Sequence, residues 1–541
     1  MSSSTVESSF DRRSALALLA ILMLAFAVRL SGIGHESLWH DEGFTWWWTR
    51  DSFATLWGPR SVLETNPPLY YSVVWVSTQL LGDDEFALRF PSAILGTMGV
   101  GATFLLGRTL AGNHVGLLAA LLTAVAAKHV YYSQDARPYS LLSLCCTLVA
   151  LGCLMFLRAA SAPPGSARSA VAGLALYVVS AVGALYAHNT GFILLAVASL
   201  VVGLWWLAQS RQWRVLGKWI GANIIVLAVW AWWLPTIVRQ MGAPSIVWIR
   251  QPSPILAVIN FSWLYGMHYL DVGNKLVEKL GQILPGLLLL GLAALACIRQ
   301  PRIGTLLLGA LAFGAPLVVF MFGVFGRPMW LERTVSWTLP LGLTLAAAAM
   351  LELRPRWLRT ATVVGVLVIA IANVALLYSS PQREPYREAM ALIEAARQPG
   401  DAILFVPQNG IMSLTYYQAR RGIGMDSYAI TPRIEPKSQG GMPYDALKMR
   451  PPLIQSPTYL KLNQLDQITE GHQRVWVLYR RKEFSDPHGA VQAWLEKNGH
   501  QVSDAELQPK LELVLVDLTK GKQKLHQPMT NVEGSATTTA H

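Results

Sequence analysis

The sequence predicts an α-helical polytopic membrane protein with a small α/β domain after residue 378. Three observations support this fold class: the composition, the number of long apolar segments, and a change of pattern towards the C-terminus. Hydrophobic residues make up 53% of the 541-residue chain and charged residues 14%, whereas about a quarter of the residues of a typical soluble domain are charged. The composition therefore argues against a wholly soluble protein.

Eleven segments are long and apolar enough to cross a bilayer, which takes roughly 20 mainly apolar residues. They are 15–33, 87–107, 114–131, 138–157, 169–187, 190–208, 216–234, 281–298, 303–325, 334–351 and 360–378. The first also resembles a signal peptide. Because "HESLWHDE" offers no small-residue cleavage site, we expect an uncleaved first span.

Segment 68–81 is apolar but short, and the distribution of basic residues decides whether it spans. If it lies along the outer surface, eleven spans run from a cytoplasmic N-terminus, residues 1–14, and every basic short loop lies on the cytoplasmic side. These loops contain Arg12, Arg13, Arg108, Arg158, Arg168, Arg211, Arg214, Lys218, Arg299, Arg302, Arg354, Arg356 and Arg359. Since short cytoplasmic loops carry an excess of Lys and Arg, we predict that 68–81 does not span and that the acidic loop 34–86 is outside.

The pattern changes after the last span. Segments 384–397 and 488–499 are typical of amphipathic helices, and 400–407, 473–481 and 511–518 of buried strands. Residues 379–519 are therefore predicted to form an extracytoplasmic α/β domain. Residues 520–541 are polar and predicted to be disordered.

The first outer loop contains "SLWHDEGFTWW", in which Asp41 and Glu42 lie among several Trp residues. One interpretation is a solvated turn at the end of the first span. The other is a general base at a membrane-edge active site, because contact with apolar rings raises the basicity of a carboxylate. Ionisable groups at membrane depth are candidates for functional sites.

A second polar segment, "SQDARPYSLL", contains Asp135, Arg137 and Tyr139 between two spans. A local ion pair that completes the loop is one interpretation. In the other, Arg137 binds a phosphate and Asp135 orients a sugar hydroxyl or a neighbouring side chain. The fixed, permanently charged fork of an Arg side chain suits phosphate.

The segment "NPPLYY" contributes Asn66, Tyr70 and Tyr71. Because Tyr favours the membrane interface, these residues are explained most simply as an interfacial anchor, although Asn66 could face inward.

Two further polar positions interrupt the apolar segments. His188 follows a span directly, and a single His in this setting is more often structural than a ligand. Arg333 follows Glu332 and either pairs with it or contacts a phosphate.

Because the predicted topology brings all these residues to the outer face, their combination predicts a substrate with a long apolar tail and an anionic head. A polyprenyl-phosphate sugar fits this description. Nothing in the sequence indicates a nucleic-acid partner.

The order "WHDEGFTWW … NPPLYYSVVW … GDDEFALRFPSAILG … YYSQDARPYSLL … YAHNTGFILL … ERTVSWTLP" resembles the membrane-embedded type C glycosyltransferases. It is more closely similar to bacterial glycosyltransferase family 39, whose relatives include the protein O-mannosyltransferases and the lipid A aminoarabinose transferase. The resemblance covers about residues 15–378, the predicted transmembrane glycosyltransferase domain. The segment after residue 380 is similar to the outer domains of some bacterial members.

The resemblance implies an inverting transferase in the bacterial plasma membrane. It moves a sugar from a polyprenyl-phosphate donor to a hydroxyl of a lipid, protein or glycan on the outer face. Asp41 becomes the catalytic base with Glu42 beside it, while Asp135, Arg137 and Arg333 are expected near the sugar phosphate. The chain departs from the family at Asn66, where a His or Lys is usual, and at "RTVSWTLP", where Arg-Tyr-Leu is usual.

No cofactor is required by the sequence. Some members of the family use a divalent metal, and Asp41, Glu42 and Asp135 could bind one, but nothing in their spacing requires it.

Two other functions are compatible with parts of the sequence. A transporter or flippase of lipid-linked saccharides should place ionisable residues near mid-membrane and pair them across repeats. The predicted spans are largely uncharged at their centres, which favours chemistry at the surface. A scaffold that presents the C-terminal domain leaves the polar residues of the outer loops unexplained.

Overall fold

The computed structural model describes residues 11–58, 61, 64–161, 167–242, 249, 251–266, 274–326, 328–407, 410–430, 458–507 and 510–519. These residues form two compact units. The first contains the chain up to residue 35 and residues 48–380, and the second contains residues 36–47 and the chain from residue 381. The predicted disordered tail, 520–541, lies outside the described residues, as do residues 1–10 of the N-terminal segment.

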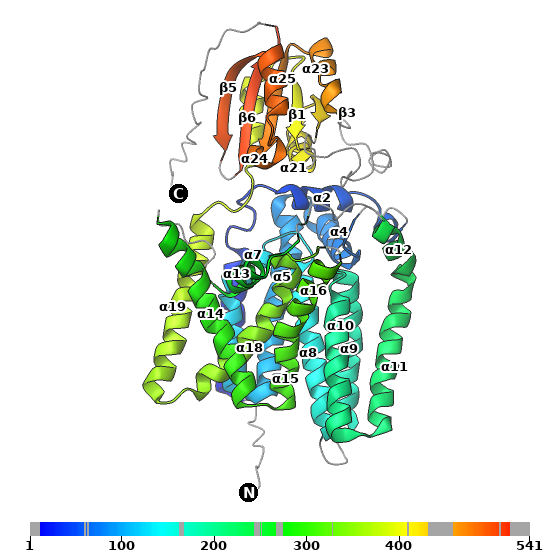
Figure 1. Ribbon diagram of the computed structural model, residues 1–541, viewed down its shortest axis with the longest axis vertical. Helices are drawn as coiled ribbons and strands as arrows, with labels where there is room; N and C mark the ends of the chain where they lie inside the picture. Colours follow the sequence, from blue (N-terminus) through cyan, green and yellow to red (C-terminus); the bar gives the residue numbers. More distant parts are fainter. Residues whose placement is uncertain are drawn as a thin grey trace. The chain divides into compact units, whose positions relative to one another are not determined.

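The first unit is a bundle of long helices (Figure 1). Its helices are α1 (Arg12–Leu30), α3 (Phe53–Trp57), α4 (Leu69–Leu81), α5 (Glu85–Ala111), α6 (Asn113–Ala124), α7 (Ala127–Ser133), α8 (Tyr139–Ser161), α9 (Ala167–Ala187), α10 (Gly191–Trp205), η2 (Trp206–Ser210), α11 (Trp213–Trp230), η3 (Ala231–Trp233), α12 (Leu234–Gly242), α13 (Pro254–Tyr265), α14 (Lys275–Arg299), α15 (Ile303–Gly309), η4 (Ala310–Gly314), α16 (Ala315–Phe325), α17 (Glu332–Val335), η5 (Ser336–Thr338), α18 (Leu339–Glu352) and α19 (Arg356–Ser379). Helix α2 (His40–Thr49) begins in the second unit and ends in the first.

The bundle confirms the predicted fold class. Within the described residues, 10 helices are long and apolar enough to cross a membrane, and a bent pair, α6 and α7, makes 11. Each corresponds to one of the predicted spans. Segment 68–81 forms α4, a helix of 13 residues, which measures about 20 Å and is shorter than the roughly 30 Å hydrocarbon core of a bilayer.

The spans differ in how much of their surface other helices cover. In α8, 89% of the most apolar window is buried, whereas the figure for α19 is 17%. Helix α19 exposes Trp357, Val364, Val368 and Ile371. Apolar side chains on the outside of a bundle of this kind suit contact with lipid rather than water.

One span is broken, contrary to the single helix expected over 114–131. Helices α6 and α7 meet at an angle of 64°. The fully buried Arg29 of α1 donates to the carbonyl oxygens of Thr123 and Ala124 at the end of α6, at 3.3 and 3.1 Å. It also contacts His129 Nδ1 at 2.8 Å and Ser133 Oγ at 3.1 Å in α7. A side chain thus satisfies carbonyl groups that a helix leaves unpaired where it ends.

The short helices α4, α7, α12 and α13 gather at one end of the bundle (Figure 1). We call this end the polar end, because the segments that contain Asn66, Arg137 and His188 lie there. The C-terminal ends of α8, α10 and α14, near which basic residues gather in the sequence, lie at the opposite end of the bundle (Figure 1). The alternation of the helices therefore separates the two sets of loops as predicted.

The second unit is built on a six-stranded sheet of order β3-β2-β1-β4-β6-β5. Strands β1 to β4 run parallel where they pair, while β6 is antiparallel to both β4 and β5. Its elements are α20 (Tyr386–Ala396), β1 (Ala402–Val406), α21 (Ile411–Arg421), β2 (Asp426–Ala429), β3 (Thr458–Tyr459), η7 (Leu462–Gln464), α23 (Asp466–Gly471), β4 (Arg474–Arg480), α24 (Lys482–Ser485), α25 (Ala490–Asn498), β5 (His500–Leu507) and β6 (Leu511–Asp517).

The sheet includes every strand predicted from the sequence. Strand β1 is buried along its whole length, and Leu404, Val477 and Val514 belong to a core that includes Val491 and Leu495 of α25. The prediction missed β2, β3 and β5. Strand β5 has the polar sequence "HQVSDAEL" and lies at the edge of the sheet, where a strand needs few apolar residues because one side has no neighbour.

Candidate active site

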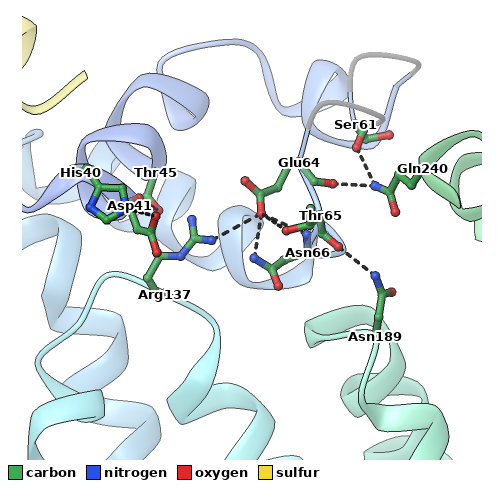
Figure 2. A network of polar contacts seen from close by, with 10 residues as sticks. All are labelled: His40, Asp41, Thr45, Ser61, Glu64, Thr65, Asn66, Arg137, Asn189 and Gln240. Atoms are coloured by element: carbon green, nitrogen blue, oxygen red, sulfur yellow. Dashed lines mark hydrogen bonds and ion pairs between the residues drawn. The ribbon is translucent and has the colours of Figure 1, made fainter. Parts of the chain in front are cut away.

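At the polar end of the bundle, the Glu64 carboxylate faces Arg137 and Asn66 (Figure 2). Glu64 Oε1 lies 3.4 Å from Arg137 Nη2, and it accepts from Asn66 Nδ2 at 2.7 Å and from the Asn66 backbone N–H at 3.0 Å. The exposed fractions of Glu64 and Arg137 are both 6%. A buried cation therefore has a buried anion beside it, as a charge removed from water requires.

The segment that carries Glu64 is itself held by two amides (Figure 2). Gln240 Nε2, from α12, donates to the carbonyl oxygens of Ser61 at 3.0 Å and of Glu64 at 2.5 Å. Asn189 Nδ2, between α9 and α10, donates to the Thr65 carbonyl at 2.8 Å. Three segments far apart in the sequence thus fix the position of the Glu64–Arg137 pair.

Aromatic side chains of α4 pack against the loop that contains Asp135 and Arg137. The Arg137 guanidinium carbon lies 5.8 Å from the centre of the Tyr71 ring, within the range of a cation–π contact. Burial raises the pKa of Tyr71 well above its usual value, so its hydroxyl stays protonated. The Tyr70 hydroxyl is 2.7 Å from Ser92 Oγ, which donates to the Asp135 carbonyl oxygen at 2.7 Å.

His188 lies in the electrostatic field of two guanidinium groups. Burial, together with the positive charges of Arg137 and Arg333, lowers the pKa of His188 to about 4. His188 Nδ1 contacts Thr190 Oγ1 at 2.9 Å, and the His188 ring centre is 6.4 Å from that of Tyr139. The same positive charges that disfavour protonation of His188 favour an anion in its neighbourhood.

The low pKa of His188 predicts how the stability of the protein depends on pH. The pKa falls from 6.5 to about 4 on folding, so the unfolded chain binds the extra proton and acid favours unfolding. The contribution of His188 to the free energy of unfolding is fully present above about pH 6.5. As the pH falls towards 4, the protein loses this contribution, which is about 3 kcal/mol.

We expect His188→Gln to reduce the loss of thermal stability between about pH 7 and pH 4.5, measured by melting in detergent. An unchanged pH dependence in His188→Gln would contradict the assignment.

Glu332 has a different partner from the one considered in the sequence. Its Oε1 lies 2.9 Å from Lys128 Nζ, and the Tyr132 hydroxyl lies 3.5 Å from the same oxygen. The described ion pairs thus link Glu332 to α7 rather than to its neighbour Arg333. Lys128 therefore joins the polar end as a residue that the sequence analysis missed.

Eight of the ten predicted site residues thus come together at the polar end: Asn66, Tyr70, Tyr71, Asp135, Arg137, Tyr139, His188 and Arg333. The other two, Asp41 and Glu42, belong to the second unit. Glu64 and Gln240 were assigned no role from the sequence. Glu64 was visible as one of several acids in the outer loop, but no pattern links it to Arg137, 73 residues later.

The two adjacent carboxylates of the second unit have different surroundings. Asp41 Oδ1 lies 3.0 Å from His40 Nε2, and 20% of the Asp41 side chain is exposed. Glu42 is fully buried, and its Oε2 is 3.5 Å from Arg383 Nε. Because an ionised carboxylate can only accept hydrogen bonds, His40 Nε2 carries the proton in the contact between His40 and Asp41. Asp41 is the more exposed carboxylate of the two.

The sequence offered Asp41, Glu42 and Asp135 as possible metal ligands without requiring a metal. Among the residues that the structure describes, no group of three or more His, Cys, Asp and Glu side chains is arranged to hold a metal ion. Asp41 and Glu42 already have His40 and Arg383 as partners.

Comparison with known proteins places the chain among proteins of related architecture. Residues 65–267 match the family described as dolichyl-phosphate-mannose-protein mannosyltransferase. The apo structure of ArnT from Cupriavidus metallidurans aligns over 93% of this chain and 98% of its own, with a TM-score of 0.62 and 16% identity. The chain has the type C glycosyltransferase fold. The predicted resemblance is confirmed.

Two further structures share this type C fold. ArnT from the same organism bound to undecaprenyl phosphate covers 92% of this chain and 97% of its own, with a TM-score of 0.57 and 16% identity. The oligosaccharyltransferase AglB from Archaeoglobus fulgidus, in complex with an inhibitory peptide and a dolichol-phosphate, covers 91% and 73%, with a TM-score of 0.50 and 12% identity. No curated protein matches the chain by sequence. The family match covers residues 65–267, and the structural likeness, at 12–16% identity, shows the shared fold.

Proposed function

We propose that the protein is an inverting glycosyltransferase that moves a hexosyl or pentosyl group from a polyprenyl-phosphate donor to an acceptor hydroxyl. The observation that carries the proposal is the buried Arg137 at the polar end, with Arg333 and the neutral His188 in its electrostatic neighbourhood. A phosphate beside them receives fixed positive charge in a poorly hydrated place, which stabilises it as a leaving group.

The apolar bundle supports the lipid part of the proposal. The polar end lies at one end of long spans whose outer surfaces are apolar, and a polyprenyl chain can lie along such surfaces while its phosphate reaches the Arg residues. The bound lipids named for two structures of the same fold, undecaprenyl phosphate and dolichol-phosphate, have this chemistry.

The reaction needs a base for the acceptor, and Asp41 is the proposed residue. Its carboxylate takes the proton of the acceptor hydroxyl while the hydroxyl oxygen attacks the anomeric carbon. The bond from that carbon to the phosphate oxygen breaks, and polyprenyl phosphate leaves with the bonding electrons. Attack opposite the leaving group inverts the configuration of the sugar.

The distribution of charge supports an orientation in the bacterial plasma membrane. Basic short loops lie at the end of the bundle opposite the polar end, and such loops favour the cytoplasmic side. The N-terminus is then cytoplasmic, and loop 34–86 and domain 379–519 face outward. The acceptor is a lipid, protein or glycan hydroxyl on that side.

The proposal is tested with purified protein in nanodiscs and a panel of short-chain polyprenyl-phosphate sugars. Release of polyprenyl phosphate is measured with and without envelope lipids and glycans as acceptors, and the anomeric configuration of the product is determined by NMR. We expect acceptor-dependent release and an inverted product. Neither binding nor release with any donor would contradict the proposal and favour a transporter, and a product of retained configuration would contradict the mechanism.

A further inference from the structure

The C-terminal domain carries the segment that contains the proposed base. Residues 36–47 and the chain from residue 381 form one compact unit, although more than 300 residues separate them in the sequence. The Leu38 backbone N–H donates to the Tyr417 hydroxyl at 2.8 Å, and Ser37 Oγ donates to Glu388 Oε2 at 2.9 Å. Helices α20 and α21 of the domain thus bind the segment just before Asp41.

The contact continues beyond Asp41 and is very close. A Cβ atom placed on Gly43 would lie 2.6 Å from the backbone nitrogen of Ser413. The Trp46 ring packs edge-on against Tyr416, with 5.1 Å between ring centres. The segment is therefore held against the domain on both sides of the carboxylate pair.

Two ion pairs of the C-terminal domain lie close to the adjacent carboxylates Asp41 and Glu42. Arg383 contacts Glu42 Oε2 at 3.5 Å and Glu36 Oε2 at 3.7 Å, and both Arg383 and Glu42 are buried. Arg480, the last residue of β4, contacts Glu384 Oε1 at 2.8 Å through Nη2 and at 2.9 Å through Nε.

The second ion pair adjoins the histidine that contacts Asp41. Burial lowers the pKa of His40, and the positive charge of Arg480 adds to this, while Asp41 and Glu384 act in the opposite direction. The groups that influence His40 are thus Arg480, Asp41 and Glu384, and they come from both the 36–47 segment and the C-terminal domain.

We infer that the C-terminal α/β domain is part of the catalytic machinery and that Arg383 is a positioning residue, which fixes the proposed base Asp41 through its ion pair with Glu42. The inference rests on the proposed function. Glu42 is fully buried and adjoins Asp41 in the chain, so the Arg383–Glu42 ion pair holds the backbone from which the Asp41 carboxylate extends. Misplacement of a reacting group by about 1 Å can reduce a rate by on the order of 10²-fold.

The test separates positioning from stability by removing both charges of the pair. Arg383→Met alone leaves Glu42 buried without its cation, which by itself destabilises a protein. The double variant Glu42→Gln/Arg383→Met removes both charges and should recover the melting temperature. We expect kcat for polyprenyl phosphate release to remain on the order of 10²-fold below wild type, with the donor KM within about twofold. Arg383→Lys keeps the charge and should recover part of kcat.

A matched control lies at the other end of β4. Arg474 Nη2 contacts Asp401 Oδ2 at 3.0 Å, about 20 Å from Arg480 along the strand. Arg474→Met/Asp401→Asn removes a comparable ion pair of the same domain and should leave kcat unchanged. Wild-type kcat in the Glu42→Gln/Arg383→Met variant, or an equal loss in the control, would overturn the inference. An inactive wild-type protein would instead contradict the proposed function.

Discussion

Asp41→Asn is expected to abolish sugar transfer while the protein folds normally. Asn has the same shape as Asp but cannot take a proton from the acceptor, and a general base contributes about 10²- to 10⁴-fold to a rate. Asp41 is partly exposed and contacts His40, so the exchange buries no new unpaired charge. We expect release of polyprenyl phosphate to fall by about 10³-fold, with an unchanged melting temperature and unchanged donor binding.

Asp83→Asn is the matched control for this substitution. Asp83 lies in the same outer loop and precedes Asp84, which caps α5, and it has no role in the proposed reaction. Its exchange should leave turnover within about twofold of wild type, because substitutions away from the reacting groups usually have small effects. Wild-type turnover in purified Asp41→Asn protein would exclude Asp41 as the base.

Arg137→Met is expected to give the second largest loss of sugar-transfer activity, for two separable reasons. It removes the proposed phosphate contact. The loss of one such electrostatic donor typically lowers the rate by about 10²- to 10³-fold, and we expect a fall of this size in kcat/KM. It also leaves the buried Glu64 carboxylate without its cation, which costs about 3–5 kcal/mol of stability. Donor binding, turnover and melting temperature should therefore all change.

The two reasons are distinguished by adding Glu64→Gln. The double variant has no buried unpaired charge, so its melting temperature should return towards wild type, while kcat/KM stays low. Arg158→Met is a control near the C-terminal end of α8, the helix that follows Arg137, where Arg158 donates to the Leu110 carbonyl oxygen. Recovery of activity together with stability in the Arg137→Met/Glu64→Gln variant would contradict a phosphate-binding role.

The spans could be predicted from the sequence because membrane insertion depends on local composition. Each of the eleven predicted segments corresponds to a long apolar helix or to the bent pair. The bend itself was not predicted, and Arg29, which binds the carbonyl groups at the end of α6, lies about 95 residues before them in the sequence. Strand β5 was missed for a related reason, since its polar sequence is stabilised by pairing with β6.

The candidate site was predictable to a similar extent. Arg137 and His188 could be found because polar residues are conspicuous at the edges of apolar segments. Glu64 could not be distinguished from the other acids of its loop, because its significance comes from burial beside Arg137. The association of residues 36–47 with the C-terminal domain depends on contacts such as Leu38 with Tyr417, 379 residues apart, and no local pattern carries that information.

The same association has a consequence for biosynthesis. Ser37 and its partner Glu388 are 351 residues apart, and a ribosome that adds about 5–20 residues per second needs roughly 20–70 s to make that length. During this time the Trp-rich loop has left the ribosome while the domain that binds it does not yet exist. We therefore expect nascent chains to be inactive until translation is almost finished, and chaperones to meet this loop earlier than any other outer segment.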